Sequence, residues 1–266
     1  MSRQVQIALV AALEREVAGI VRGWQWEKIT VADTARKLYY SENAVLICAG
    51  TGAARANIAA KKLLQQYHPK LLISIGFAGS CVRQLSPGDV VVPSRVVESA
   101  TNREFATICG QGTLVTLDRV AGARLKQTTA TRYDAQVVDM EAAGVASAAA
   151  GAVELTGTKC DFAAIKVISD GAGEEMDFLA EFITPEGFAT ARFVAYIALR
   201  PALWKKVKQL QQNSQRAAAA LEVAVGEAVT DWTGFASRHT PAKENIAAQN
   251  GDKKNQELAP GTAAKQ

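Results

Sequence analysis

The sequence has little of what metal-binding and disulfide-stabilised proteins need. It contains only four cysteines, which are far apart and form no CxxC motif, and only two histidines. This scarcity argues against a zinc site and against the disulfide framework of a small secreted domain. We therefore expect no metal and no organic cofactor, and we expect the protein to work in the reducing cytoplasm.

Long apolar runs and dense basic patches are also missing. No apolar run reaches the roughly 18 residues that a membrane-spanning helix needs, and no charged segment followed by an apolar one suggests a secretory signal. The net charge of +4 is modest, and the basic residues are scattered without interleaved aromatic residues, unlike those of a nucleic-acid surface. We expect a small-molecule ligand, with no nucleic-acid partner and no membrane span.

The overall composition fits one large α/β domain. The chain has 266 residues, of which 48% are hydrophobic and 21% charged, which is enough to bury a substantial core. We predict a single domain over residues 1–236, with C-terminal helices at 187–232 packed on it. Residues 237–266 contain few large apolar residues, and that composition predicts a disordered tail.

Short apolar runs predict buried strands, and apolar residues at helical spacing predict helices between them. Apolar spacing predicts a helix directly after the first strand, another after residue 52, and a long one that begins near Pro201. The stretch 98–112 is polar and is expected to be a loop. The alternation predicts a parallel or mixed sheet with helices on both faces. The expected strands are 5–13, 28–31, 37–41, 44–49, 71–75, 90–93, 114–117 and 162–168.

Two carboxylates, Asp139 and Glu141, lie inside an apolar run of small residues that continues to Ala150. Burying an unpaired carboxylate costs several kcal/mol, so a functional use is one interpretation. The alternative is structural: Asp139 caps a helix that begins near Met140, and Glu141 interacts with the positive end of that helix.

Further carboxylates lie where predicted strands end. Glu14 and Glu16 follow the first strand, and Asp170 follows the strand at 162–168. Ligands of open α/β sheets bind outside the carboxyl ends of strands. Acidic residues in a first helical turn, or an aspartate at a helix N-cap, would explain the same residues structurally. The Gly50-Thr51-Gly52 turn either presents backbone N–H groups to a ligand or only permits a tight turn.

Taken together and in this order, four segments resemble the superfamily of purine nucleoside phosphorylases and methylthioadenosine/S-adenosylhomocysteine nucleosidases. They cover about residues 5 to 175. The segment between Val97 and Asp139 and the proline-led C-terminal helix look most like the branch of hopanoid-associated phosphorylases. The four segments are IALVAALEREV, AGTGAARANIAAKKLL, ISIGFAGSCVRQLSPGDVVVP, and VVDMEAAGVASAAA followed by AIKVISDGAG.

The resemblance implies a three-layer α/β/α fold with a central, mixed, twisted sheet, and cleavage of the N-ribosidic bond of a purine nucleoside. By this resemblance Glu16 is the general base that activates water, and Asp170 protonates the leaving purine. Glu141 binds the ribose and Met140 packs against the sugar. Such groups suit the chemistry, because a purine anion leaves poorly and negative charge stabilises an oxocarbenium-like sugar.

The resemblance also assigns further residues to the substrate pocket. Val120 stands where the methylthioadenosine-type nucleosidases have an aromatic residue that stacks on adenine, so base stacking is weakened. Phe77 is expected to change the sugar or base end of the pocket. The remaining pocket residues assigned in this way are Ala78, Gly79, Ala121 and Ser169.

The nucleophile is either water or phosphate. Ser74 and Phe77 stand where one branch of phosphorylases has an arginine and a serine, and the anionic Glu16 would repel phosphate. We therefore favour hydrolysis. The alternative is a phosphorylase that uses Arg15 and Arg55, and a third possibility from another class is a non-catalytic nucleoside-binding protein. Relatives commonly form oligomers, so the resemblance also implies a homo-oligomer, with a dimer favoured.

Overall fold

The computed structural model describes residues 5–31, 33–184 and 187–240, and one mixed sheet runs through it. In the described part of the chain this sheet has eleven strands, and most of them follow the order β2-β3-β4-β1-β5-β10-β9-β7-β8. Strand β11 pairs with β5 and β6 outside this path. The strands are β1 (Ile7–Ala11), β2 (Gln25–Val31), β3 (Thr34–Tyr40), β4 (Ala44–Cys48), β5 (Leu71–Ser80), β6 (Val90–Val91), β7 (Arg95–Glu98), β8 (Arg103–Ala106), β9 (Thr113–Thr116), β10 (Ala135–Asp139) and β11 (Asp161–Asp170).

Four parallel strands form the centre of the sheet. β1 pairs with β4 on one edge and with β5 on the other, and β11 follows β5 over almost its whole length. β1 and β4 are buried at every position, as expected for strands that are covered on both faces. The parallel arrangement brings the carboxyl ends of β1, β5 and β11 to the same edge of the sheet.

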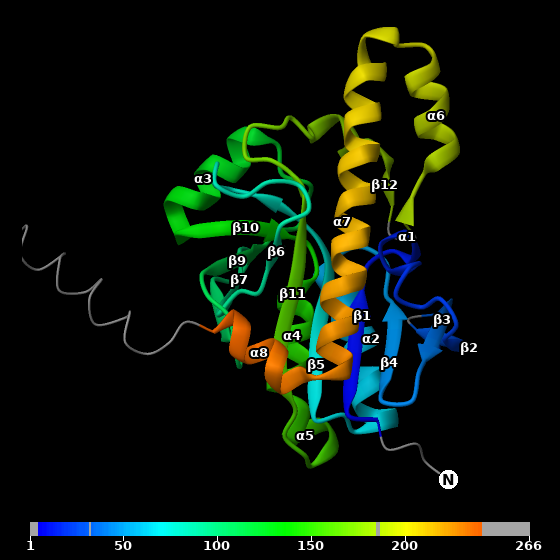
Figure 1. Cartoon of the computed structure of the whole chain (residues 1–266), viewed down its shortest axis with the longest axis vertical. Helices are drawn as coiled ribbons and strands as arrows, with labels where there is room; N and C mark the ends of the chain where they lie inside the picture. The colour runs from blue at the N-terminus through cyan, green and yellow to red at the C-terminus, as the bar shows by residue number, and fades with distance from the viewer. Residues whose placement is uncertain (1–4, 32, 185–186, 241–266) are drawn as a thin grey trace, which may run out of the picture.

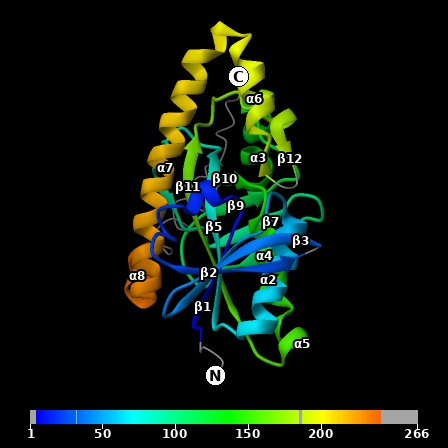
Figure 2. The same cartoon turned by 90° about the vertical axis from the view of Figure 1, so that its right-hand side faces the viewer.

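Helices cover both faces of the sheet (Figure 1). One layer contains α2 (Ala53–Tyr67), α4 (Ala142–Ala150) and α5 (Ala152–Thr156). The other contains α1 (Glu14–Val17), α7 (Trp204–Thr230) and α8 (Trp232–His239). Figure 2 shows α7 and α8 on the side of the sheet opposite α2 and α5. The expected three-layer α/β/α fold with a mixed sheet is therefore confirmed.

A long helical arm follows β11. It begins with a 3₁₀ turn at Asp177–Phe182 and a short hairpin of β12 (Ile183–Thr184) and β13 (Gly187–Phe188). Helix α6 (Thr190–Ala198) then leads through a second 3₁₀ turn, Pro201–Leu203, into α7. With 27 residues, α7 is about 40 Å long, and its first turns extend with α6 beyond the sheet (Figure 1). No helix in the ranges that the structure describes is long and apolar enough to cross a membrane.

Several expected elements differ from the observed ones. β5 continues five residues past Ile75, because its later residues pair with β10 and β11. The stretch expected to be a loop contains β8, which pairs with β7. The helix expected after β1 is only one turn long, and helix α3 (Ala123–Tyr133) was not expected.

The C-terminal boundaries also need correction. Residues 187–188 belong to a strand, so the C-terminal helices begin at Thr190. The tail expected from Ser237 is wrong for residues 237–239, because α8 continues to His239, with Phe235 buried and Arg238 paired with Glu227. The rest of the expected tail, from 241 onward, lies outside the described residues.

Helices α2 and α4 pack unusually closely at Gly144. A Cβ atom added at Gly144 would lie 1.9 Å from the carbonyl oxygen of Ala53. The side-chain amide of Asn57 donates to the carbonyl oxygen of Gly144 at 2.9 Å and joins the same two helices. This contact fixes α4 relative to α2, and therefore fixes Glu141, which directly precedes α4, relative to Gly52 at the start of α2.

We expect Gly144→Ala to lower the free energy of unfolding by about 2 kcal/mol or more, because overpacking at a backbone contact forces the helices apart. The matched control is Gly226→Ala on the exposed face of α7, where an added Cβ meets nothing within 4 Å. That change should raise stability by up to about 1 kcal/mol. Urea unfolding of the three proteins measures both effects, and equal stabilities would contradict the close packing.

Candidate functional site

A cavity of about 700 Å³ lies at the ends of β1, β5, β10 and β11. Almost all residues that the sequence analysis selected line it, although they come from segments far apart in the chain. Arg55, on α2, and Glu14, on α1, lie outside the cavity lining. The selected residues that line the cavity are Arg15, Glu16, Phe77, Ala78, Gly79, Val120, Ala121, Met140, Glu141, Ser169 and Asp170.

Glu16 lies on the single turn of α1 and is buried, with 7% of its surface exposed. Burial raises the pKa of its carboxyl group from 4.5 to about 7, although the positive charges of Arg15 and Lys166 oppose this rise. Its carboxylate lies against the backbone of β5, since a Cβ at Gly76 would be 2.8 Å from Oε2. Glu16 can therefore exchange a proton near neutral pH.

Glu141 connects the start of α4 to the start of α2. The backbone N–H of Gly52 donates to its Oε1 at 2.9 Å. Burial raises the pKa of Glu141 to about 7, and the negative charge of Asp139 adds to this effect, whereas Lys166 and the Gly52 N–H oppose it. Glu141 is the N-cap residue of α4, but its side chain makes no cap hydrogen bond there.

Asp139 has the structural role that the sequence suggested. Its Oδ2 accepts the backbone N–H of Ala142 at 2.8 Å, at the start of α4, and its Oδ1 accepts the hydroxyl of Thr116 at 2.7 Å. Lys166 on β11 forms an ion pair with Oδ2 at 2.8 Å and donates to Ser74 at 3.0 Å. The side chains of Asp139 and Lys166 are almost completely buried, and of the two only Asp139 lines the cavity.

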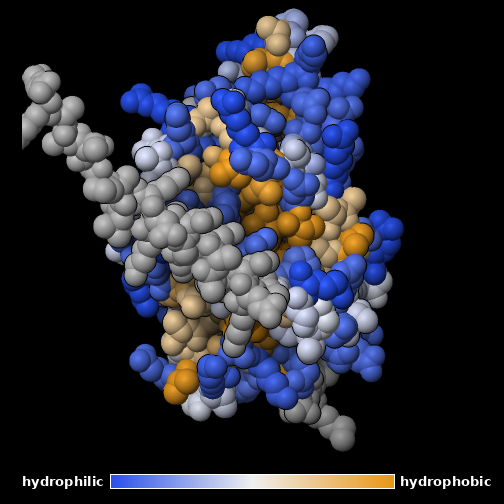
Figure 3. All heavy atoms as spheres, turned by 60° about the vertical axis from the view of Figure 1, so that its left-hand side comes forward, coloured by the Kyte–Doolittle hydropathy of each residue, from blue (hydrophilic) through white to orange (hydrophobic). Residues whose placement is uncertain are grey.

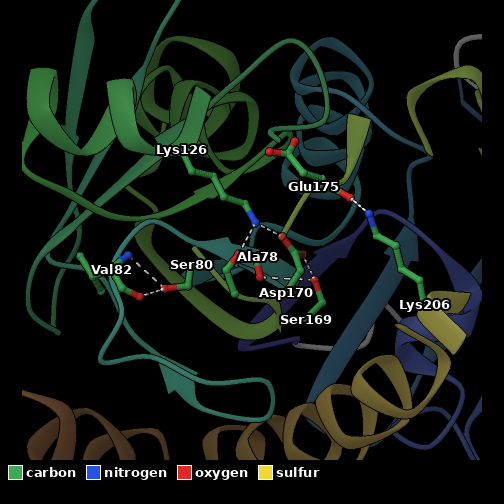
Figure 4. Close-up of polar contacts among 9 residues, drawn as sticks. Ala78, Ser80, Val82, Lys126, Ser169, Asp170, Glu175 and Lys206 are labelled. Carbon is green, nitrogen blue, oxygen red and sulfur yellow. Dashed lines mark hydrogen bonds and ion pairs between the residues drawn. The ribbon is translucent and has the colours of Figure 1, made fainter. Parts of the chain in front are cut away.

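Asp170 forms a second buried ion pair at the other end of the cavity, as Figure 4 shows. Its Oδ2 pairs with the ammonium group of Lys126 on α3, and its Oδ1 accepts the hydroxyl of Ser169 at 2.6 Å. Lys126 also donates to the carbonyl oxygen of Gly171 at 2.7 Å. A lysine from a helix that is distant in the sequence therefore reaches the carboxylate of Asp170.

A bulge in β11 places Asp170 at the cavity. The pairing of β11 with β5 shifts between Ile168 and Asp170, so that Ser169 has no partner in the register. Bulges redirect side chains next to functional sites. Gly79 lies opposite, and a Cβ at this position would be 2.9 Å from both Asp170 Oδ2 and Lys126 Cε. The lack of a side chain at Gly79 makes room for the ion pair.

The C-terminal arm supplies an apolar part of the cavity wall. Lys206 on α7 donates to the backbone carbonyl of Glu175 at 2.6 Å and holds the segment after β11 against this helix (Figure 4). On one face of the molecule, apolar side chains gather at the centre, between polar ones (Figure 3). The apolar cavity residues from the arm are Met176, Leu179, Phe193, Val207 and Leu210, and polar Gln211, Ser214 and Gln215 follow on α7.

Sequence reasoning missed the two buried lysines and the residues of the arm. Lys166 could have been noticed, because a single charge inside the apolar strand AAIKVIS is the same kind of signal that drew attention to Asp139. Lys126 gave no such signal, because its segment ARLKQTTATRY has the polar composition of an exposed helix. The arm was assigned to helices without any prediction that it would reach the site.

The site offers carboxylates and ammonium groups rather than metal ligands. Over the described ranges, the structure contains no group of three or more histidine, cysteine, aspartate or glutamate side chains that could hold a metal ion. The four cysteines are free and buried. The chemistry that this arrangement can perform is proton transfer and stabilisation of charge on a small molecule.

The raised pKa of Glu16 has a consequence for stability. Between about pH 4.5 and 7 the folded protein holds a proton on Glu16 that the unfolded chain has released, so stability falls as pH rises through this window. Glu16→Gln removes this loss. We expect the variant to match the wild type near pH 4.5 and to be more stable above pH 7, by at most about 3 kcal/mol.

Urea unfolding from pH 4.5 to 8 measures this difference. Glu42→Gln, at an exposed carboxylate, controls for the loss of one negative charge. A wild type and a Glu16→Gln variant with the same pH dependence of stability would show that Glu16 is not protonated in the folded state near neutral pH.

The chain is similar in sequence to known nucleosidases. Residues 6–116 match the family model described as "Phosphorylase superfamily". A 5′-methylthioadenosine/S-adenosylhomocysteine nucleosidase of Marinomonas sp. (strain MWYL1) is 32% identical over 95 residues, which are 34% of this chain and 41% of that protein. A Bacillus velezensis protein of the same name is 25% identical over 65% of this chain and 89% of its own length. At 29% to 35% identity, the chain spans only 39% to 41% of the length of three curated relatives.

Solved structures extend the likeness to most of the chain. The 5′-methylthioadenosine nucleosidase of Arabidopsis thaliana superposes with a TM-score of 0.62 over 85% of this chain and 95% of its own, at 17% identity. At that identity the likeness concerns the fold. The resemblance to the superfamily is thus confirmed by the phosphorylase-superfamily match at residues 6–116, and the chain shares its fold with this solved structure.

Proposed function

We propose that this protein hydrolyses the N-ribosidic bond of a purine nucleoside that carries an apolar 5′ substituent. One observation carries the proposal: three buried carboxylates, Glu16, Glu141 and Asp170, line the same cavity from three different segments. Burying three acids near one another is costly. A protein that only binds a ligand has little need for all three, so this arrangement favours an enzyme.

The proposed roles follow from the two ends of the cavity. Glu141 accepts hydrogen bonds from the ribose hydroxyls, and Met140 packs against the sugar. The purine base lies toward Asp170 and Ser169, between the backbone of Ala78 and Gly79 on one side and the side chains of Val120 and Ala121 on the other. These residues all line the cavity. Because residue 120 is a valine and not an aromatic residue, the backbone at this end of the sheet contributes more to binding the base than stacking does.

Glu16 is the proposed general base. A base works best when its pKa lies near the working pH, and burial gives Glu16 a pKa of about 7. The carboxylate takes a proton from water as the water oxygen attacks C1′. Glu16 and Glu141 also add negative charge near the sugar, which stabilises the positive charge that develops on the ring as the bond to the base breaks.

Water is favoured over phosphate as the nucleophile. Arg15 lines the cavity, but Arg55 does not, so only one of the two arginines considered for phosphate is in place. Ser74 accepts a hydrogen bond from Lys166 and is fully buried away from the cavity. The bulky Phe77 and the carboxylate of Glu16 further disfavour a dianion beside C1′. A phosphorylase that uses Arg15 remains the alternative within the same superfamily.

The apolar wall from the arm supports a substituted 5′ position. Met176, Leu179, Phe193, Val207 and Leu210 line the cavity, and an apolar group would remove this surface from water at a gain of about 25 cal/mol per Å². A free 5′-hydroxyl would gain little there. The curated relatives are named for 5′-methylthioadenosine and S-adenosylhomocysteine, and both molecules carry a thioether at this position.

The first test measures release of free base from 5′-methylthioadenosine, adenosine and inosine, each with and without phosphate. We expect base release without phosphate, with the highest kcat/KM for 5′-methylthioadenosine. Strict dependence on phosphate would replace hydrolysis by phosphorolysis. No turnover of any of the three nucleosides would favour the non-catalytic nucleoside-binding protein.

The second test concerns Asp170. Because a purine anion leaves poorly, we expect Asp170→Asn to lower kcat for 5′-methylthioadenosine at least about 100-fold, while the near-isosteric side chain keeps the fold. Thermal unfolding checks the fold, and Asp161→Asn, a partly exposed aspartate at the opposite end of the same strand, is the matched control. Near-wild-type turnover by Asp170→Asn would mean that another residue protonates the base.

The cytoplasmic location and the homodimer stay predictions. Gel filtration tests the dimer directly.

A further inference from the structure

Lys126 is the most deeply buried charge at the end of the cavity that receives the base. Its side chain is 1% exposed, it reaches the cavity from α3, and its ammonium group is bonded to Asp170 and to the backbone of Gly171. Such charge-assisted contacts are strong and fix geometry. Lys126 therefore determines where the Asp170 carboxylate lies and which charge it faces.

A purely structural role does not explain where the Lys126–Asp170 pair lies. The chain already has one, Asp139–Lys166, which joins strands and caps α4. The Lys126–Asp170 pair differs because both partners line the cavity and because Gly79 leaves the space that the pair occupies. Both members of this pair therefore belong to the surface that a ligand in the cavity would contact.

We propose that Lys126 is the positioning residue of the leaving-group end, which fixes Asp170 and supplies through it the proton that the departing base takes up. This inference rests on the proposed nucleosidase activity. The Asp170 carboxylate accepts hydrogen bonds from the Lys126 ammonium group and from the Ser169 hydroxyl, and the ammonium group is the more acidic of these two donors.

The proposed step conserves protons and electrons. The bond between C1′ and the base breaks and both of its electrons go to the base, which takes a proton from Asp170 as Asp170 receives one from Lys126. The water oxygen bonds to C1′ and its proton goes to Glu16. Solvent then carries the proton from Glu16 back to the neutral amine of Lys126. The net reaction is nucleoside plus water to free base plus sugar.

The test compares two substrates that differ in how much their base needs a proton. The chlorine in 6-chloropurine riboside stabilises the departing anion, whereas adenosine has a poorer leaving group of similar size. We expect Lys126→Met to lower kcat about 100-fold or more on adenosine and less than about 10-fold on 6-chloropurine riboside, with KM nearly unchanged on both. Lys62→Met, at an exposed lysine of α2, should leave both rates at the wild-type level.

Equal losses of kcat on the two substrates would overturn the proposal, because a merely structural lysine affects both alike. A wild type that cleaves neither of these nucleosides nor 5′-methylthioadenosine would instead refute the proposed function. If Lys126→Met does not fold, Gly79→Ala displaces the pair while keeping both charges. This variant should also lower kcat more on adenosine than on 6-chloropurine riboside. Gly173→Ala, where an added Cβ meets nothing within 4 Å, is its control.

Discussion

The structure depends on how buried charge is compensated at one edge of the sheet. Glu16, Asp139, Glu141 and Asp170 are all less than a tenth exposed, and four uncompensated carboxylates there would not be compatible with a stable fold. Two of them face buried lysines, Asp139 with Lys166 and Asp170 with Lys126. The other two, Glu16 and Glu141, have pKa values raised to about 7 by burial, so each carries only part of a charge at neutral pH.

This compensation gives the cavity two chemically different ends. At the proposed sugar end, two carboxyl groups whose pKa values are raised by burial share the influence of Lys166. At the proposed base end, a single carboxylate is held in a fixed ion pair with Lys126. In the proposed mechanism, proton acceptance and proton donation are therefore separated in space. The parallel strands make this possible, because β1, β5 and β11 end at the same edge and hold the two ends at a fixed separation.

Close backbone packing keeps these groups in place. Gly76 and Gly79 on β5 lie against Glu16 and against the Lys126–Asp170 pair, and Gly144 holds α4 against α2. Side chains at these positions would occupy the space of the charged groups or push the helices apart. The arm behaves differently, because Lys206 and the apolar face of α7 close the cavity from outside the sheet. The sheet thus fixes the charged groups of the cavity, and the arm adds the apolar wall.

By itself, the sequence determined the layers of the fold and the carboxylates of the cavity, because strands covered on both faces are continuous apolar runs and the carboxylates at their ends interrupt those runs. It also indicated that Asp139 caps a helix. Only the tertiary structure decided that Asp170 faces Lys126, that Arg55 lies outside the cavity and that the C-terminal arm forms part of its wall. The physical reason is that local patterns record which residues are buried, whereas the charge that a buried group faces depends on segments far away in the chain. Lys126 and Asp170 are 44 residues apart, and no local pattern links them.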